Sequence, residues 1–149
     1  MSQRTGARTS LEPDATVRTR PSPRALAGVC GPMFVAAAAG AVGLATGALD
    51  LGAEVTARLP GASPLLAGAA LGLVVALPMG ATTVAGWWRS ARTADLGVLA
   101  GTALIGWIAV EIAVIRTFSW LQPICASYGA VVLGLALLLR GSNEPRRAP

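Results

Sequence analysis

Four long apolar stretches, separated by short polar connections, divide the chain. Each contains about 20 mostly apolar residues, the length that a helix needs to cross the hydrocarbon core of a bilayer, which is about 30 Å thick. Such a helix satisfies its backbone hydrogen bonds internally, as a spanning segment must. The pattern therefore predicts an all-α fold, a four-transmembrane-helix bundle with up-down-up-down topology. The predicted helices cover residues 25–49, 65–86, 96–115 and 120–139.

The two ends of the chain are polar. Residues 1–24 contain five arginines and three prolines and little that could be buried, so we expect a disordered cytoplasmic tail. Residues 140–149 form a second, short basic tail. The first apolar run is longer than the core of a signal peptide, about 7 to 15 residues, and is therefore predicted to be a membrane span. A single membrane domain, residues 25–139, results.

The connection between the first two spans, residues 50–63, carries an amphipathic pattern. Apolar positions recur at i, i+4 and i+8, while Glu54 and Arg58 form an i, i+4 pair on another face. The apolar positions are Leu51, Val55 and Leu59. The pattern indicates a short helix that lies at the membrane surface and ends at Pro60 and Gly61. A solvated loop fits the same residues almost as well.

The second span contains Pro78 in its interior. A proline at such a position removes a backbone hydrogen bond and is predicted to kink the helix. Membrane helices tolerate the kink when neighbouring groups satisfy the freed carbonyl, and the hydroxyls of Thr82 and Thr83 lie one turn further on.

Composition agrees with a membrane protein and explains the basic charge. Hydrophobic residues make up 54% of the chain, the mean hydropathy is +0.62 and the net charge is +5. All twelve basic residues are arginines, and ten of them lie in residues 1–24, 89–95 and 140–149. Because positive residues collect at the cytoplasmic face, the charge indicates topology rather than nucleic-acid binding. The chain is predicted to lie in the cell membrane as a multi-pass protein with both termini cytoplasmic.

Glycines recur at four-residue spacing and predict close helix contacts. One pair in the first span and one pair in the second fall at the same depth in antiparallel neighbours, which favours contact between these helices. A pair in the third span matches the depth of Gly80 and Gly86 in the second span. The predicted helix-packing residues are Gly43, Gly47, Gly68, Gly72, Gly97 and Gly101.

The residue types argue against an enzyme. The chain contains no histidine and no lysine, and its cysteines and acidic residues form no cluster at metal-ligand spacing. The usual pairs of nucleophile and base, phosphate loops and zinc sites are therefore not expected. We expect no catalytic residue, no metal and no cofactor.

Glu111 is the one carboxylate inside a predicted span, and a charged residue at membrane depth is by default a functional hypothesis. Arg116 follows five residues later, so Glu111 lies about 7.5 Å below the end of its helix. Gln122 occupies the same layer of the next helix, on a face of mostly small residues. We predict an intramembrane polar site formed by Glu111 and Gln122, with Thr46 or Tyr128 as a further member.

The second half of the chain resembles a known group of proteins. The sequence GWIAVEI at 106–112, followed by IRTFSWLQP at 115–123, is similar to a segment of small, uncharacterised four-helix integral membrane proteins of actinobacteria. The similarity lies mainly in residues 101–139. It implies a four-helix membrane fold and no known activity.

Two functions fit these observations. The first is a non-enzymatic structural or accessory membrane component, in which Glu111 helps to hold helices together, since interhelical hydrogen bonds stabilise membrane bundles. The alternative is a small oligomeric proton- or cation-coupled transporter or channel, in which Glu111 is the exchanging group. The expected partners are the lipid bilayer and either further copies of the chain or a larger membrane complex. Nucleic acid is not an expected partner.

Overall fold

The computed structural model describes residues 21–59, 63–116 and 119–143, and within them every regular element is a helix. Four helices are long and apolar enough to cross a membrane, which confirms the predicted four-helix bundle. These are Pro23–Thr46, Pro64–Trp87, Thr93–Val114 and Leu121–Ser142. The expected N-terminal tail up to residue 20, the stop at Pro60 and Gly61, and the end of the basic C-terminal tail lie outside the described residues.

The first span is helix α1 (Pro23–Thr46), and both of its ends have a local cause. The Ser22 hydroxyl accepts a hydrogen bond from the Ala25 N–H, and a proline follows it at the first helical position, where a missing donor costs least. At the other end Gly47 has φ +74°, the left-handed conformation that glycine adopts freely, and it stops the helix three residues before the predicted Leu49.

The second span runs without a break from Pro64 to Trp87 but changes its winding near the middle. It consists of α3 (Pro64–Leu71), a π-helical turn η2 (Gly72–Ala76) and α4 (Leu77–Trp87). In η2 the Leu77 N–H bonds to the Gly72 carbonyl, one residue further back than in an α-helix. The wider turn ends two residues before Pro78, and π-helical turns, like prolines, are identified sites at which helices change direction. Thr82 and Thr83 donate to the carbonyls of Pro78 and Met79, each within its own turn.

The third and fourth spans are α5 (Thr93–Ile115) and α6 (Leu121–Asn143). Before α6 the Ser119 N–H donates to Gln122 Oε1 at 3.3 Å, and the Ser119 hydroxyl accepts from the Leu121 N–H at 3.3 Å. These bonds resemble those of a capping box, except that the hydroxyl accepts from the N–H two residues further on rather than three. The short helix predicted between the first two spans is α2 (Ala53–Arg58), and its Glu54–Arg58 ion pair is present at 2.7 Å.

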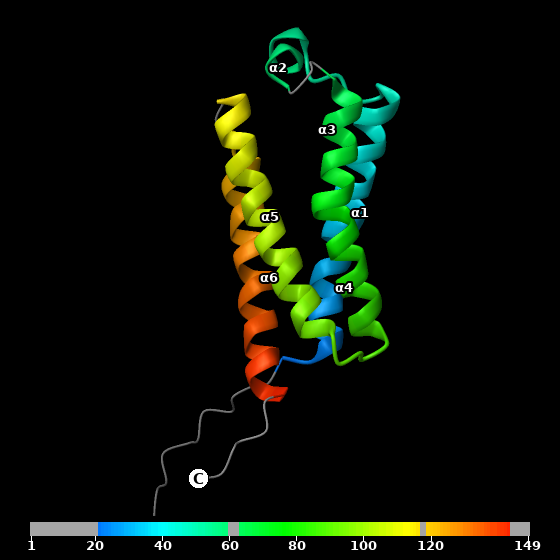
Figure 1. Cartoon of the computed structure of the whole chain (residues 1–149), viewed down its shortest axis with the longest axis vertical. Coiled ribbons are helices and arrows are strands. Elements are labelled where there is room, and N and C mark those ends of the chain that lie inside the picture. The colour runs from blue at the N-terminus through cyan, green and yellow to red at the C-terminus, as the bar shows by residue number, and fades with distance from the viewer. Residues whose placement is uncertain (1–20, 60–62, 117–118, 144–149) are drawn as a thin grey trace, which may run out of the picture.

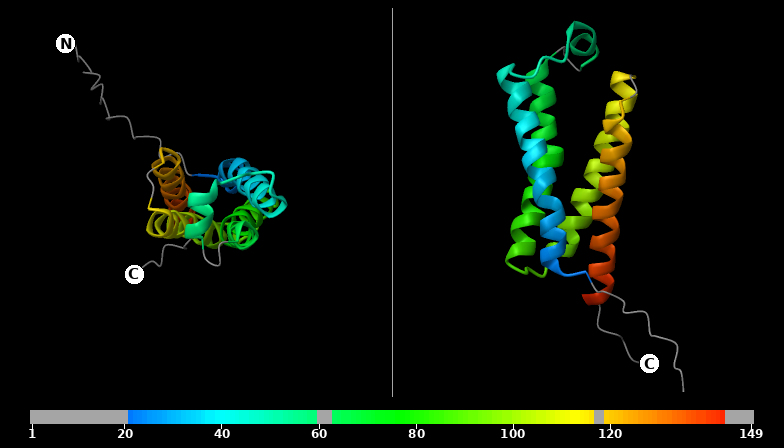
Figure 2. Two further views of the ribbon diagram at one scale, coloured as in Figure 1. Left: turned by 90° about the horizontal axis from the view of Figure 1, so that it is seen from above. Right: turned by 180° about the vertical axis from the view of Figure 1, so that it is seen from behind.

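The bundle is wedge-shaped (Figure 1). Helices α5 and α6 pack along each other on one side, while α1 packs against α3 and α4 on the other. The two sides meet at the α4–α5 end and diverge towards the end that carries α2, as both side views show (Figures 1 and 2). The buried core accordingly gathers towards the closed end. Its members include Leu26, Cys30, Met79, Ala100, Leu104, Val132 and Ala136.

Three of the predicted packing glycines lie at close contacts between helices. A Cβ atom on Gly68 would lie 2.6 Å from the Ala41 carbonyl oxygen of α1, and one on Gly101 would lie 2.7 Å from the Leu133 nitrogen of α6. A Cβ atom on Gly97 would meet both Leu26 and Ala136 at under 3 Å. The glycines of α5 therefore face α6 and α1, because α5 pairs most closely with α6. Helices α4 and α5 are in contact, but the atoms nearest to Gly80 and Gly86 belong mainly to α1, so these glycines do not pair with Gly97 and Gly101.

The remaining three predicted packing glycines have looser surroundings. A Cβ atom on Gly43 would meet only the Leu49 side chain just beyond the end of its own helix. Gly47 has open space around it and serves as the left-handed cap of α1, while Gly72 lies at ordinary van der Waals distance from Ala41. The α1–α3 contact therefore depends mainly on Gly68.

Candidate functional site

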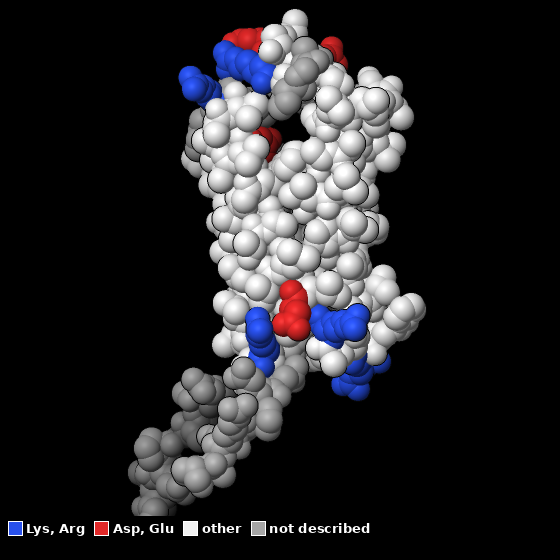
Figure 3. Space-filling model, in the orientation of Figure 1, with Lys and Arg blue, Asp and Glu red and all other residues white. Residues whose placement is uncertain are grey.

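A pocket of about 390 Å³ occupies the open end of the wedge, between α3 and α5 and beneath α2. Figure 3 shows the hollow between the two sides of the molecule, with an acidic side chain on its wall. The volume falls in the range of small-molecule sites, about 300–1,000 Å³. Apart from Glu111, its lining is apolar: Leu44, Leu51, Leu59, Leu66, Ala67, Ala70, Leu71, Trp107, Val110 and Val114.

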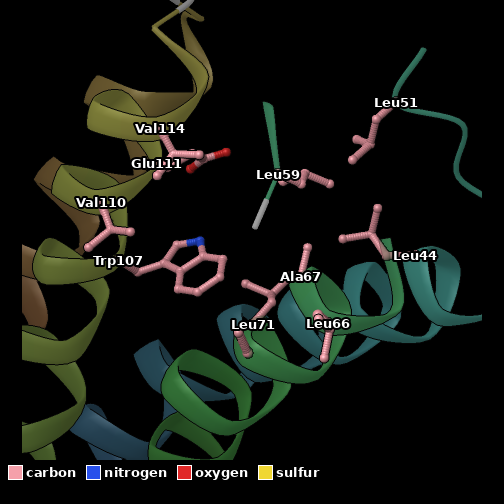
Figure 4. Close-up of a pocket in the computed structure, with 11 residues that line it drawn as sticks. Leu44, Leu51, Leu59, Leu66, Ala67, Leu71, Trp107, Val110, Glu111 and Val114 are labelled. Atoms are coloured by element: carbon pink, nitrogen blue, oxygen red, sulfur yellow. The ribbon is translucent and has the colours of Figure 1, made fainter. Parts of the chain in front are cut away.

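Glu111 is the polar group of this pocket. Its side chain is half-buried, and Figure 4 shows the carboxyl pointing from α5 into the cavity beside the Trp107 ring. Within the described part of the chain the carboxyl makes no hydrogen bond and no ion pair. An apolar enclosure with one polar group that is accessible from the cavity and has no partner among the described residues is the arrangement of a binding site rather than of a packed core.

The other residues predicted to join Glu111 use their polar groups elsewhere. Gln122 is buried, with 6% of its surface exposed, and its Oε1 caps α6 through the Ser119 N–H. The Thr46 hydroxyl donates to the Val42 carbonyl of its own helix at 2.8 Å. The Tyr128 hydroxyl donates to the Val29 carbonyl and ties α6 to α1.

Helix α2 covers the open end of the pocket. Seen from above, it lies across the space between the two sides of the bundle (Figure 2). Leu51, just before α2, and Leu59, just after it, both line the pocket. The Asp50 carboxylate accepts the Gly52 N–H at 2.8 Å and shapes the turn into the helix. The apolar pattern at i, i+4 and i+8 predicts this short helix. It does not by itself indicate that the two leucines contact a pocket.

Two arginines lie beside the mouth of the pocket. Arg58 at the end of α2 and Arg116 at the end of α5 line a second, open depression of about 660 Å³ together with Ala113 and Val114. Val114 belongs to both hollows, so they adjoin each other. Figure 3 shows basic side chains at this end of the molecule. Arg116 has φ +52°, a left-handed conformation that ends α5.

The two cysteines are not among the residues that line the pocket. Cys30 is buried, Cys125 is half-buried, and both thiols are free. Among the described residues no group of three His, Cys, Asp or Glu side chains is placed to hold a metal ion.

Comparison with known proteins adds no relative. The chain matches no protein-family model, no curated protein and no solved structure. The four apolar helices by themselves identify it as a polytopic membrane protein in contact with the lipid bilayer.

Proposed function

We propose that this chain is a non-enzymatic accessory component of the cell membrane that binds a ligand from the bilayer in the Glu111 pocket. The hollow lies on a side of the bundle, along the apolar spanning helices, and the pocket walls are almost entirely aliphatic and aromatic. A hydrophobic molecule can therefore enter the pocket without leaving the apolar phase.

The observation that carries this proposal is the position of the Glu111 carboxyl. A carboxyl that held α5 against α6 would hydrogen-bond to the neighbouring helix, as polar groups do in membrane bundles. Instead it points into the cavity (Figure 4), and the close contact of α5 with α6 is made by Gly101. A carboxyl at membrane depth that faces a cavity and has no partner among the described residues is better explained by ligand binding than by packing.

The arginines support an orientation for this site. Ten of the twelve lie in residues 1–24, 89–95 and 140–149, and the described parts of these segments lie at the closed end of the wedge. We propose that this end and both termini are cytoplasmic. The pocket then opens in the outer half of the membrane.

Trp107 provides a direct test of ligand entry because it is the one tryptophan of the chain that lines the pocket. A variant with Trp87, Trp88 and Trp120 replaced by phenylalanine leaves Trp107 as the only indole. Titration of the purified protein in detergent with lipid brominated on its acyl chains should quench this fluorescence saturably at low lipid-to-protein ratios. A matched variant that keeps only Trp87, 65% exposed at the other end of the bundle, should show only weak, linear quenching. Equal quenching curves for the two variants would contradict the proposal.

The second candidate is proton- or cation-coupled transport through an oligomer, with Glu111 as the exchanging group. It is favoured by the same observation, since a carboxyl without a fixed partner is free to exchange an ion. Glu111→Gln preserves size and hydrogen-bonding capacity but removes titration. Transport requires a flux in liposomes, driven by a pH gradient, that the native protein supports and this variant does not. If the native protein gives no flux across a broad panel of ions and solutes, only the accessory role remains.

A further inference from the structure

The groups around the pocket follow an order along the membrane normal. Arg58 and Arg116 lie at the end of the bundle, around the open depression. Glu111 is five residues before Arg116 on α5, which places it about 7.5 Å deeper. Below and opposite Glu111 the pocket is lined by leucines and by Trp107. From the membrane surface inwards, the site is therefore first cationic, then hydrogen-bonding and finally apolar.

A diacyl phospholipid presents complementary groups in the same order: an anionic phosphate, ester carbonyls a few ångströms deeper, and acyl chains. Guanidinium groups bind phosphate oxygens through short charge-assisted hydrogen bonds, and two of them from different helices can hold one phosphate. A carboxyl group in its neutral form can donate a hydrogen bond to an ester carbonyl. The apolar walls can contact an acyl chain without the desolvation of polar groups, which would cost free energy.

We infer that the ligand of this site is a membrane phospholipid, with its phosphate between Arg58 and Arg116 and one acyl chain in the pocket past Glu111. The inference rests on the proposed function, because it names the ligand class of the same pocket. The adjoining hollows that share Val114 form one continuous site for it. The end of α2 and the residue after it contribute to both parts, since Arg58 lines the depression and Leu59, the next residue, lines the pocket.

The ion pair within α2 bears on how the phosphate is held. Arg58 bonds to Glu54 at 2.7 Å, and the Glu54 side chain is 82% exposed whereas that of Arg58 is 39% exposed. The pair contributes to the orientation of the Arg58 guanidinium, and because the Glu54 carboxylate is exposed to solvent its attraction for Arg58 is weak.

The test compares headgroups in the variant that keeps Trp107 as its only tryptophan. Brominated phosphatidylglycerol and brominated diacylglycerol with the same chains differ in the phosphate headgroup. We expect the phospholipid to quench at about tenfold lower concentration, in line with a charge-assisted phosphate contact. The double substitution Arg58→Gln and Arg116→Gln should remove this preference while the response to diacylglycerol stays unchanged.

Two controls separate the phosphate contact from general charge and from the fold of α2. Arg89→Gln with Arg92→Gln removes two exposed arginines at the opposite end and should leave the preference intact. Glu54→Gln breaks the ion pair but keeps Arg58, and should leave phospholipid binding equal or tighter. If both brominated lipids quench Trp107 saturably and equally, the phospholipid inference is overturned while the proposed function stands. If neither lipid quenches saturably, both the phospholipid inference and the proposed function are overturned.

Discussion

Gly101 on α5 and Gly129 on α6 lie backbone against backbone. A Cβ atom on Gly101 would lie 2.9 Å from the Gly129 carbonyl oxygen, and one on Gly129 would lie 3.2 Å from the Gly101 carbonyl oxygen. Without a hydrophobic driving force between helices in lipid, such close packing of small residues is a main source of association. The α5–α6 pair therefore forms one side of the wedge by itself, and Glu111 is left available to the pocket.

Gly101→Ala should destabilise the bundle. The added methyl group meets backbone atoms of α6 at under 3 Å, so the helices must separate, and overpacking of this kind costs about 1–3 kcal/mol. Gly106→Ala is the matched control on the same helix, because a Cβ atom there meets nothing within 4 Å. It should be neutral or stabilising by about 0.5–1 kcal/mol through helix propensity. Unfolding in mixed micelles by a denaturing detergent measures both, and equal stabilities would contradict the observed packing.

Tyr128→Phe should weaken the attachment of α6 to α1. The substitution removes the hydroxyl that donates to the Val29 carbonyl and keeps the ring. Hydrogen bonds between membrane helices average about 0.6 kcal/mol, so a loss of about 0.5–1.5 kcal/mol in the free energy of unfolding is expected. Unchanged stability would show that this bond contributes nothing to the fold.

Gly47→Ala tests the cap of α1 separately from packing. Space around Gly47 is open, yet φ is +74°, so the expected cost of about 1 kcal/mol comes from backbone strain alone. Gly47→Asn should cost less, since asparagine tolerates this conformation better than alanine does. The free energies of unfolding of the two variants test this prediction. An alanine variant at least as stable as the asparagine variant would argue against a left-handed cap.

Reporter fusions test the proposed orientation. A reporter enzyme that is active only outside the cytoplasm should work when fused after Gly61 and should fail when fused after Arg92 or Arg147. The arginine distribution predicts this pattern because positive segments stay on the cytoplasmic side. Activity of the fusion at Arg92 would overturn the topology and would place the pocket at the cytoplasmic face.

The sequence predicts the fold well because each span is long and continuously apolar, and a helix is the only open-chain element that satisfies its backbone in lipid. The Glu54–Arg58 pair is equally predictable, since both partners lie one turn apart on α2. The winding of η2 is not predictable from Pro78 alone, because a proline in a membrane helix can also produce a simple kink whose freed carbonyl bonds to a neighbouring hydroxyl or to water.

The site was only partly predictable. Glu111 stands out in the sequence as a carboxylate at membrane depth, but the surroundings of its side chain depend on how far α3 and α5 diverge. That divergence follows from contacts at the closed end, where Gly97 fits against Leu26 and Ala136, and no local pattern specifies it. The predicted site includes Gln122 because it lies at the same depth as Glu111. In the structure its Oε1 instead accepts the capping bond from the Ser119 N–H.

The central claim is that Glu111 serves the pocket and does not hold the helices together. The most direct measurement is the free energy of unfolding of Glu111→Leu beside that of the native protein, in the same mixed micelles. We expect the variant to be as stable as the native protein or more stable, because it replaces an unsatisfied carboxyl with an apolar side chain in an apolar cavity. A loss of about 1 kcal/mol or more, the size expected for a broken interhelical hydrogen bond, would contradict the claim and assign Glu111 to the structure of the bundle.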